Sequence, residues 1–277
     1  MGKFDGVLIC TDLDGTLIKS DESISDEVKE KIAYFMSEGG YFTIMTGRSP
    51  QTARKIADEI KINCPYGCTN GGGLYDHYDE KYVRVTYLTD GYKEIVRYAE
   101  KHIDGIGYQV TTEDSMFFCC ENEAMERYRQ RTGAKYIKGC LDDIENGAVK
   151  VVFGDMDQGR MDRVENVVKS RPGAEKFDFV RTEETLFEIL PKDVNKGKAL
   201  KMLCEYLNID IRKTVAVGDY TNDVEMIKAA GVGIAVENAN EDAKAAADYI
   251  TVSNDNDAIA RVIEDIESGK ISFDERK

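Results

Sequence analysis

Strand-like and helix-like segments alternate at both ends of this chain, and this alternation constrains the fold more than any other feature. Near the start, the apolar runs GVLIC and YFTIM have the length of buried strands, and an amphipathic segment follows each. From residue 196 onward the alternation returns, with KTVAV, VGIAV and DYITV as strands. Such a pattern predicts a parallel sheet covered by helices. We therefore expect both ends, residues 1–81 and 190–277, to build one Rossmann-like α/β domain.

The first two helix-like segments carry end signals. In SDEVKEKIAYFMSEGG, Ser25 is expected to cap the helix, and Gly39 and Gly40 are expected to end it. In SPQTARKIADEI, Ser49 is expected to cap the helix, and Pro50 takes the first helical position, where no N–H is needed. These signals place each helix after a strand, as a βαβα unit requires.

The middle of the chain, residues 82–189, has a different pattern. Alternating, aromatic strand-like stretches occur in KYVRVTYL, GYQVTTEDSMFFC, AVKVVFGD and FDFVRTEETLFEIL. Helical segments near 90–102, 121–132 and 158–169 separate them. We expect an inserted α+β domain, and a length of 277 residues accommodates a core domain with a smaller companion.

Composition limits the partners. The chain has 37 Lys and Arg against 52 Asp and Glu, a net charge of -15, and no basic run, which argues against nucleic acid and anionic membranes as partners. No apolar stretch approaches 18 residues and the polar start MGKFDG does not read as a signal peptide, so we expect a cytoplasmic protein. An anionic ligand would therefore have to be neutralised locally, by a metal, a lysine or helix N-termini.

Two aspartates, Asp12 and Asp14, stand one residue apart directly after the first strand, in LICTDLDGTL. Open α/β sheets place their ligands at the carboxyl ends of strands, which is where this pair lies. Taken alone, however, the pair is more typical of an Asx-rich turn than of a site.

Three further polar clusters occupy equivalent places. Thr46-Gly47-Arg48 ends the second strand, Lys196 begins a helix, and Asp219 ends another buried strand just before Asn222 and Asp223. Carboxylates that converge in one crevice need a cation, and oxygen ligands with room for water suit Mg²⁺. One cation, one lysine and several helix N-termini would then fit a phosphate.

The clusters occur in the order D-x-D-G-T, T-G-R, a lone Lys and G-D-x-x-N-D, which resembles the haloacid dehalogenase superfamily of phosphotransferases. The insert between the second and third clusters, the segment TNGG and the tail GIAVENANEDAKAAADYITVSN resemble the Cof-type sugar phosphatase branch with a type IIB cap. The resemblance spans essentially the whole chain. It implies that the insert is a cap that decides specificity by closing over the crevice and excluding water.

The resemblance also implies a mechanism. Asp12 would be the nucleophile that forms an aspartyl-phosphate intermediate, and Asp14 would protonate the leaving alcohol and later activate water. Mg²⁺ would be held by the Asp12 side chain, the Asp14 backbone carbonyl and Asp219. Asp223 would either ligate the metal or stand behind the ligands and orient Asp219 or a bound water.

The same resemblance assigns the phosphate contacts. The phosphoryl oxygens would be bound by the backbone N–H of Leu13 and by Thr46, Gly47, Lys196 and Asn222.

Three residues are candidates for contacting the substrate. Arg48 would either reach the substrate or only cap the crevice, and the sequence does not separate these roles. Asn70 and Gly71 follow a predicted strand. Beyond these three, cap aromatics such as Tyr108, Phe117 and Phe118 could contact the leaving group, although packing in the cap core is the commoner role.

These expectations describe a Mg²⁺-dependent phosphatase of a small phosphorylated metabolite, such as a sugar phosphate. Two alternatives remain open: a non-catalytic protein that binds a phosphorylated ligand on the same scaffold, and a phosphomutase, which also needs both aspartates. The sequence indicates neither the particular substrate nor the oligomeric state.

Overall fold

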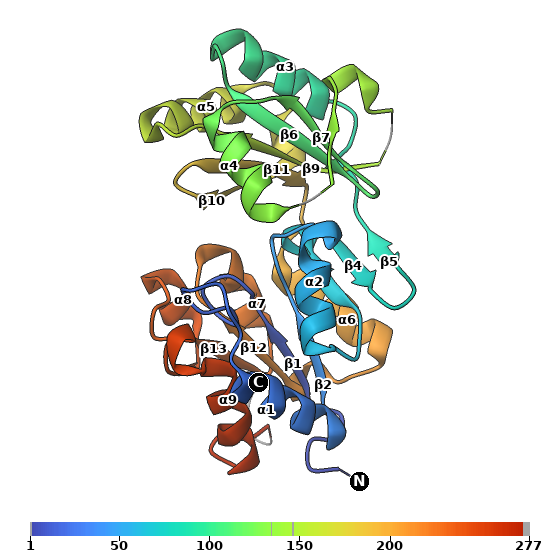
Figure 1. Cartoon of the computed structure of the whole chain (residues 1–277), viewed down its shortest axis with the longest axis vertical. Helices are drawn as coiled ribbons and strands as arrows, with labels where there is room; N and C mark the ends of the chain where they lie inside the picture. Colours follow the sequence, from blue (N-terminus) through green and yellow to red (C-terminus); the bar gives the residue numbers. More distant parts are fainter. Residues whose placement is uncertain (1, 134, 146, 274–277) are drawn as a thin grey trace. The chain divides into compact units, whose positions relative to one another are not determined.

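The computed structural model describes residues 2–133, 135–145 and 147–273, and the chain forms two compact units (Figure 1). The core unit comprises Met1–Arg84 and Asn195–Lys277, and the cap unit comprises Val85–Val194. The boundaries expected from the sequence, at 81/82 and 189/190, lie a few residues earlier.

A parallel five-stranded sheet with the order β14-β13-β12-β1-β2 organises the core unit. In it, Leu8 of β1 lies opposite both Thr214 of β12 and Tyr41 of β2. Strands β1 and β12 are buried along their whole length, as expected of parallel strands covered on both faces. The strands are β1 (Leu8–Thr11), β2 (Tyr41–Ile44), β12 (Thr214–Gly218), β13 (Val232–Ala235) and β14 (Tyr249–Ile250).

Helices cover both faces of this sheet. Because successive side chains of a strand point to opposite faces, Ile9 packs into the cluster that includes α1, α2 and α9, whereas Leu8 and Cys10 pack against α6 and α7. The two-layer cover confirms the predicted α/β architecture. The helices are α1 (Asp26–Ser37), α2 (Pro50–Ile60), α6 (Lys196–Leu207), α7 (Val224–Ala229), α8 (Glu241–Ala246) and α9 (Ala258–Glu267).

The helix-end signals of the sequence hold in part. The Ser25 hydroxyl accepts from the Val28 N–H at 3.2 Å, and the chain leaves α1 through Gly39, whose φ is +91°. Ser49 stands at the N-cap of α2 before Pro50, but its side chain makes no capping hydrogen bond, and its Oγ lies 3.3 Å from Thr52 Oγ1 instead. Ser49 is therefore the N-cap residue of α2, as expected, although its hydroxyl makes no capping hydrogen bond.

A small second sheet, with the order β3-β4-β5, completes the core unit. Its strands are β3 (Tyr66–Cys68), β4 (Gly73–Asp76) and β5 (Lys81–Val85). The run KYVRV, which the sequence pattern assigned to the insert, thus lies almost entirely in the core unit as β5. Its alternating pattern is that of a half-exposed strand and does not say which sheet it joins.

The cap unit is a six-stranded sheet with the order β10-β11-β9-β6-β7-β8. Residues of α3 (Tyr92–His102) and α5 (Gln158–Ser170) share one apolar cluster with it, and α4 (Glu123–Thr132) shares another. Tyr108 and Phe118 are buried in these clusters, so they pack in the cap core. The strands are β6 (Gly107–Thr112), β7 (Met116–Cys120), β8 (Ile137–Lys138), β9 (Ala148–Gly154), β10 (Phe177–Glu183) and β11 (Leu186–Pro191).

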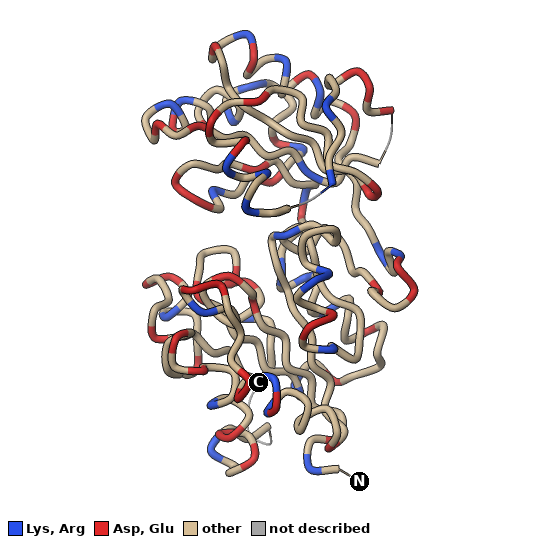
Figure 2. The backbone as a smooth tube through the Cα atoms, in the orientation of Figure 1, with Lys and Arg blue, Asp and Glu red and all other residues tan. Residues whose placement is uncertain are grey.

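Charged residues are mixed along both units. Figure 2 shows Lys and Arg interspersed with Asp and Glu in each unit, without a long basic stretch in the described chain. None of the helices formed by the described residues is both long enough and apolar enough to cross a membrane.

Candidate active site

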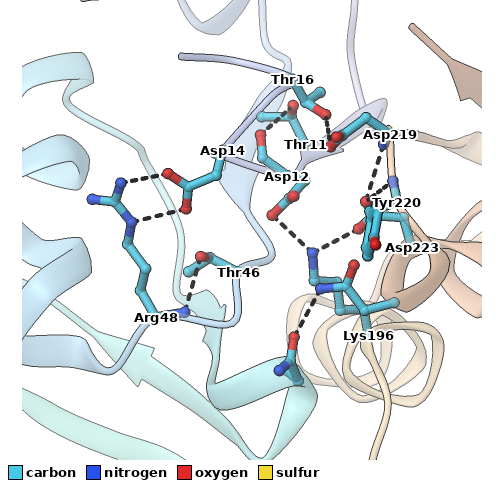
Figure 3. A network of polar contacts seen from close by, with 12 residues as sticks. Thr11, Asp12, Asp14, Thr16, Thr46, Arg48, Lys196, Asp219, Tyr220 and Asp223 are labelled. Atoms are coloured by element: carbon cyan, nitrogen blue, oxygen red, sulfur yellow. Dashed lines mark hydrogen bonds and ion pairs between the residues drawn. The ribbon is translucent and has the colours of Figure 1, made fainter. Parts of the chain in front are cut away.

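The site is built at the carboxyl ends of the core strands. Asp12 directly follows β1, and its backbone N–H donates to the carbonyl of Val217 in β12 at 2.9 Å. Thr46 follows β2 and Asp219 follows β12, while Lys196 is the first residue of α6. Parallel strands bring these ends to one edge, so the sequence clusters meet there (Figure 3).

Lys196 is the cation of the site. Its Nζ lies 2.7 Å from Asp12 Oδ1 and 2.6 Å from Asp223 Oδ1, and its side chain is fully buried. Burial by itself lowers the pKa of Lys196, but the charges of Asp12 and Asp223 outweigh it and raise that pKa. Lys196 is therefore a permanently charged ammonium beside the expected nucleophile.

Asp223 holds the loop after β12. Its Oδ1 accepts from Lys196, and its Oδ2 accepts from the backbone N–H groups of Asp219 and Tyr220 at 3.0 and 3.1 Å. It is fully buried. Asp223 thus fixes the backbone that presents Asp219, without a hydrogen bond to the Asp219 carboxylate itself.

Three carboxylates converge with one ammonium. One carboxylate oxygen from each of Asp12, Asp219 and Asp223 lies within 4.8 Å of the others, and Lys196 contributes the single positive charge. With all three carboxylates ionised, the cluster would hold two negative charges in excess of the ammonium in a buried place. Burial, together with Asp223, raises the pKa of Asp12 well above its usual range and the pKa of Asp219 to about 6. The donor set and its excess charge fit a divalent cation that prefers oxygen.

Thr16 and Gly15 complete the loop after β1. The Thr16 hydroxyl donates to Asp219 Oδ1 at 2.8 Å. Gly15 has a φ of +77°, and a Cβ there would lie 2.5 Å from Asp219 Oδ2. The D-x-D-G-T motif therefore needs glycine because the chain turns back tightly against Asp219.

Asp14 lies apart from this cluster and pairs with Arg48. Arg48 Nε donates to Asp14 Oδ2 at 2.9 Å, and Arg48 Nη2 donates to Asp14 Oδ1 at 2.5 Å. The sequence left the role of Arg48 between substrate contact and closure of the crevice. The structure brings it instead to the expected general acid and base (Figure 3).

Other predicted phosphate and substrate contacts lie in or near the Thr46-Gly47-Arg48 segment. Thr46 is buried, and its hydroxyl accepts from the Arg48 backbone N–H at 3.1 Å. A Cβ on Gly47 would lie 3.0 Å from Asn70 Oδ1, which in turn accepts from Asn222 Nδ2 at 3.0 Å. Asn70 and Asn222 are thus joined across 152 positions of sequence, and Asn222 already spends one donor on Asn70.

Left-handed backbone shapes the TNGG segment. Thr69, Asn70 and Gly71 have φ values of +50°, +55° and +93° in succession. A Cβ on Gly71 would lie 2.3 Å from the carbonyl oxygen of Asn195, the residue before Lys196. Gly71 therefore supports the start of α6 by close backbone contact, a role the sequence did not indicate.

Sequence reasoning missed two asparagines. Asn238 Nδ2 donates to the Gly15 carbonyl at 2.8 Å, and the Asn240 N–H donates to the Asp219 carbonyl at 2.9 Å. Both lie in the segment ENANED, which contributed to the sequence analysis only as part of the resemblance to the Cof-type branch. They connect the loop after β13 to the loops that carry Asp14 and Asp219.

A family model for haloacid dehalogenase-like hydrolases matches residues 9–263. The chain belongs to this family. The uracil-derivative phosphatase YcsE of Bacillus subtilis, named 5-amino-6-(5-phospho-D-ribitylamino)uracil phosphatase, is 29% identical over 256 residues, which cover 92% of this chain and 94% of that protein.

Solved structures agree with the family assignment. A haloacid dehalogenase-like hydrolase from Bacteroides thetaiotaomicron matches with a TM-score of 0.84 at 26% identity, covering 94% of this chain and 99% of that one. The subclass IIB sugar phosphatase BT4131 matches with a TM-score of 0.80 at 20% identity, covering 96% and 100%, a likeness of fold alone. This haloacid dehalogenase-like hydrolase is of the Cof type and a phosphatase, as its motifs, its insert and its tail together predicted.

Proposed function

We propose that this hydrolase is a Mg²⁺-dependent phosphatase of a small phosphorylated metabolite that works through an aspartyl-phosphate at Asp12. The observation that carries the proposal is the buried cluster of Asp12, Lys196, Asp219 and Asp223. A carboxylate held against a buried ammonium, beside further carboxylates whose ionisation burial disfavours, suits a cation and a phosphate together.

The chain's own residues fit the metal. Asp12 and Asp219 offer carboxylate oxygens, the Asp14 backbone carbonyl is the third expected ligand, and Asp223 keeps the loop of Asp219 in place. When bound, Mg²⁺ would offset the repulsion between the Asp12 carboxylate and a phosphate dianion. It would also favour the ionised form of Asp12, which burial disfavours in the metal-free protein.

The first half-reaction transfers the phosphoryl group to the enzyme. A carboxylate oxygen of Asp12 attacks phosphorus, the bond between phosphorus and the alcohol oxygen breaks, and Asp14 gives its proton to that oxygen. Lys196, within hydrogen-bond reach of Asp12, would lie beside the transferred phosphoryl group and stabilise the negative charge that develops there. We propose that the Leu13 N–H, Thr46, Gly47 and Asn222 position the phosphoryl oxygens.

The second half-reaction regenerates Asp12. Water loses a proton to Asp14, its oxygen bonds to phosphorus, and the bond between phosphorus and Asp12 breaks to release orthophosphate. The same carboxyl group therefore acts as acid and then as base, and it starts each cycle in the same protonation state.

The substrate is proposed only as a class. YcsE is named for a phosphate ester of a ribitylaminouracil, so this compound and sugar phosphates are the first candidates for a screen. A phosphomutase would depend on a sugar bisphosphate and would return little orthophosphate, and a binding protein would return none.

The test is phosphate release from p-nitrophenyl phosphate by the wild-type protein and by Asp12→Asn, with Mg²⁺ and with EDTA. Asparagine keeps the volume of aspartate but cannot act as the nucleophile, so activity should be lost while thermal unfolding stays cooperative. Chelation should abolish wild-type activity reversibly. More than a few per cent of metal-dependent activity in Asp12→Asn would exclude Asp12 as the nucleophile.

A further inference from the structure

The pair formed by Asp14 and Arg48 is the feature of the site that the proposed function does not yet explain. Two parallel hydrogen bonds, of 2.9 and 2.5 Å, join the guanidinium to both oxygens of the carboxylate. Among the described residues, no other side chain donates to the Asp14 carboxylate. The orientation of this carboxyl group therefore depends on Arg48.

Asp14 needs such support more than its neighbours do. Its side chain is 60% exposed, whereas that of Asp12 is 8% exposed and lies against Lys196. An exposed aspartate turns freely about its side-chain bonds, yet proton transfer requires an oxygen within hydrogen-bond reach of the leaving group. Within the D-x-D motif, Asp12 is thus paired with Lys196 and Asp14 with Arg48.

Arg48 is itself well anchored. Its backbone N–H donates to Thr46 Oγ1 at 3.1 Å, and its carbonyl accepts from the Thr69 N–H at 2.9 Å. The backbone of Arg48, from which the side chain extends, is therefore held by the loop after β2 and by the segment after β3. A planar guanidinium that extends from a fixed backbone restrains both carboxylate oxygens, which the single ammonium of a lysine would not do.

We propose that Arg48 is a positioning residue for Asp14, whose carboxyl group it holds in the orientation required for proton transfer. This inference rests on the proposed function, in which Asp14 is the acid and the base. It assigns Arg48 a role through Asp14, in contrast to direct binding of the phosphate or of the leaving group.

The leaving group distinguishes these roles. For Arg48→Ala, kcat/KM reports the steps up to departure of the alcohol, and only a basic alcohol needs a proton from Asp14. We expect a loss of about 10- to 100-fold with an alkyl phosphate, shrinking toward none with 2,4-dinitrophenyl phosphate. Arg48→Lys should lie closer to Arg48→Ala than to the wild type, because it lacks the second hydrogen bond.

The activated substrate gives a second readout. Once dinitrophenol has departed, hydrolysis of the intermediate still requires Asp14 as base, so Arg48→Ala should show a burst of dinitrophenol followed by a slow steady state. Inhibition by orthophosphate should be unchanged, because Arg48 does not bind phosphate in this account.

Arg54→Ala is the matched control. Arg54 lies in α2, and its Nη2 is 2.7 Å from Glu80 Oε1, in an exposed ion pair outside the site. Losing an exposed ion pair changes the stability of a protein little, so both variants should fold. Arg54→Ala should keep wild-type kinetics with every leaving group.

Other outcomes overturn the inference. A loss that is equal for all leaving groups, with weaker inhibition by orthophosphate, would make Arg48 a phosphate ligand. Crystal structures provide the readout that does not depend on turnover: the Asp14 carboxylate should have one orientation in the wild type and several in Arg48→Ala. The same single orientation in both would refute positioning, whereas an inactive wild type with the pair intact would refute the proposed function alone.

Discussion

Replacing Asp223 by asparagine tests whether this buried carboxylate holds the site together. Its Oδ1 accepts from Lys196 Nζ at 2.6 Å, and its Oδ2 accepts from the N–H groups of Asp219 and Tyr220 at 3.0 and 3.1 Å. An asparagine has one acceptor oxygen and one donor nitrogen in the same space. Whichever way the amide turns, its NH₂ group meets donors that have lost their acceptor.

The structure sets the size of the effect. Each buried donor without an acceptor costs about 1–3 kcal/mol. If the amide nitrogen faces the backbone, the N–H groups of Asp219 and Tyr220 lose their acceptor. If it faces Lys196, the ammonium loses Asp223 as an acceptor and keeps its 2.7 Å contact with Asp12. The second arrangement is the cheaper one, and we expect the free energy of unfolding to fall by about 2–3 kcal/mol.

Asp219→Asn is the control for this measurement. The Asp219 carboxylate accepts from the Thr16 hydroxyl, and burial with nearby Asp223 raises its pKa to about 6, so its charge is unfavourable in the folded state. Removing that charge should leave the stability of the metal-free protein unchanged or higher. The assay is urea unfolding at pH 7.5 with EDTA, followed by circular dichroism. Equal stability of wild type and Asp223→Asn, or equal losses in both variants, would refute the reasoning.

Two further predictions concern stability. The pKa of Asp219 is 3.8 in the unfolded chain and about 6 in the folded chain. As the pH rises from about 4 to 6, the metal-free wild type should therefore lose about 1–3 kcal/mol of its free energy of unfolding relative to Asp219→Asn, measured by urea unfolding. A relative gain over that pH range would contradict this prediction. Gly71→Ala should lower stability by at least about 2 kcal/mol in thermal unfolding, because its φ is +93° and the new Cβ would lie 2.3 Å from the Asn195 carbonyl. Gly133→Ala, with a φ of +59° and open space, should lose only about 1 kcal/mol, and equal losses would show that the contact with Asn195 is unimportant.

The sequence predicted the core fold because its signals are local. Buried parallel strands appear as continuous apolar runs, and the strand ends carry the polar residues of the site. Asp12 and Asp219 could be placed together from this rule, because β1 and β12 are neighbours whose carboxyl ends meet. Lys196 was harder, since a lysine at a helix start is usually exposed, and its burial depends on two aspartates from distant segments.

The side-chain contacts that the sequence did not predict depend on tertiary structure. Arg48 could not be assigned because its partner, Asp14, comes from another loop, and side-chain reach does not follow from the position of a residue in a strand. The bond between Asn70 and Asn222 likewise joins segments that only the fold brings together.

The central claim is that Asp12 accepts the phosphoryl group, and the most direct measurement is to trap that group on the enzyme. The wild-type protein would be mixed with Mg²⁺ and an activated aryl phosphate, quenched in acid within milliseconds, digested and examined by mass spectrometry. We predict that the peptide containing Asp12 carries one added phosphoryl group, located on Asp12 by fragmentation and absent from Asp12→Asn. Steady turnover with no phosphorylated peptide, or with the group on another residue, would contradict the claim.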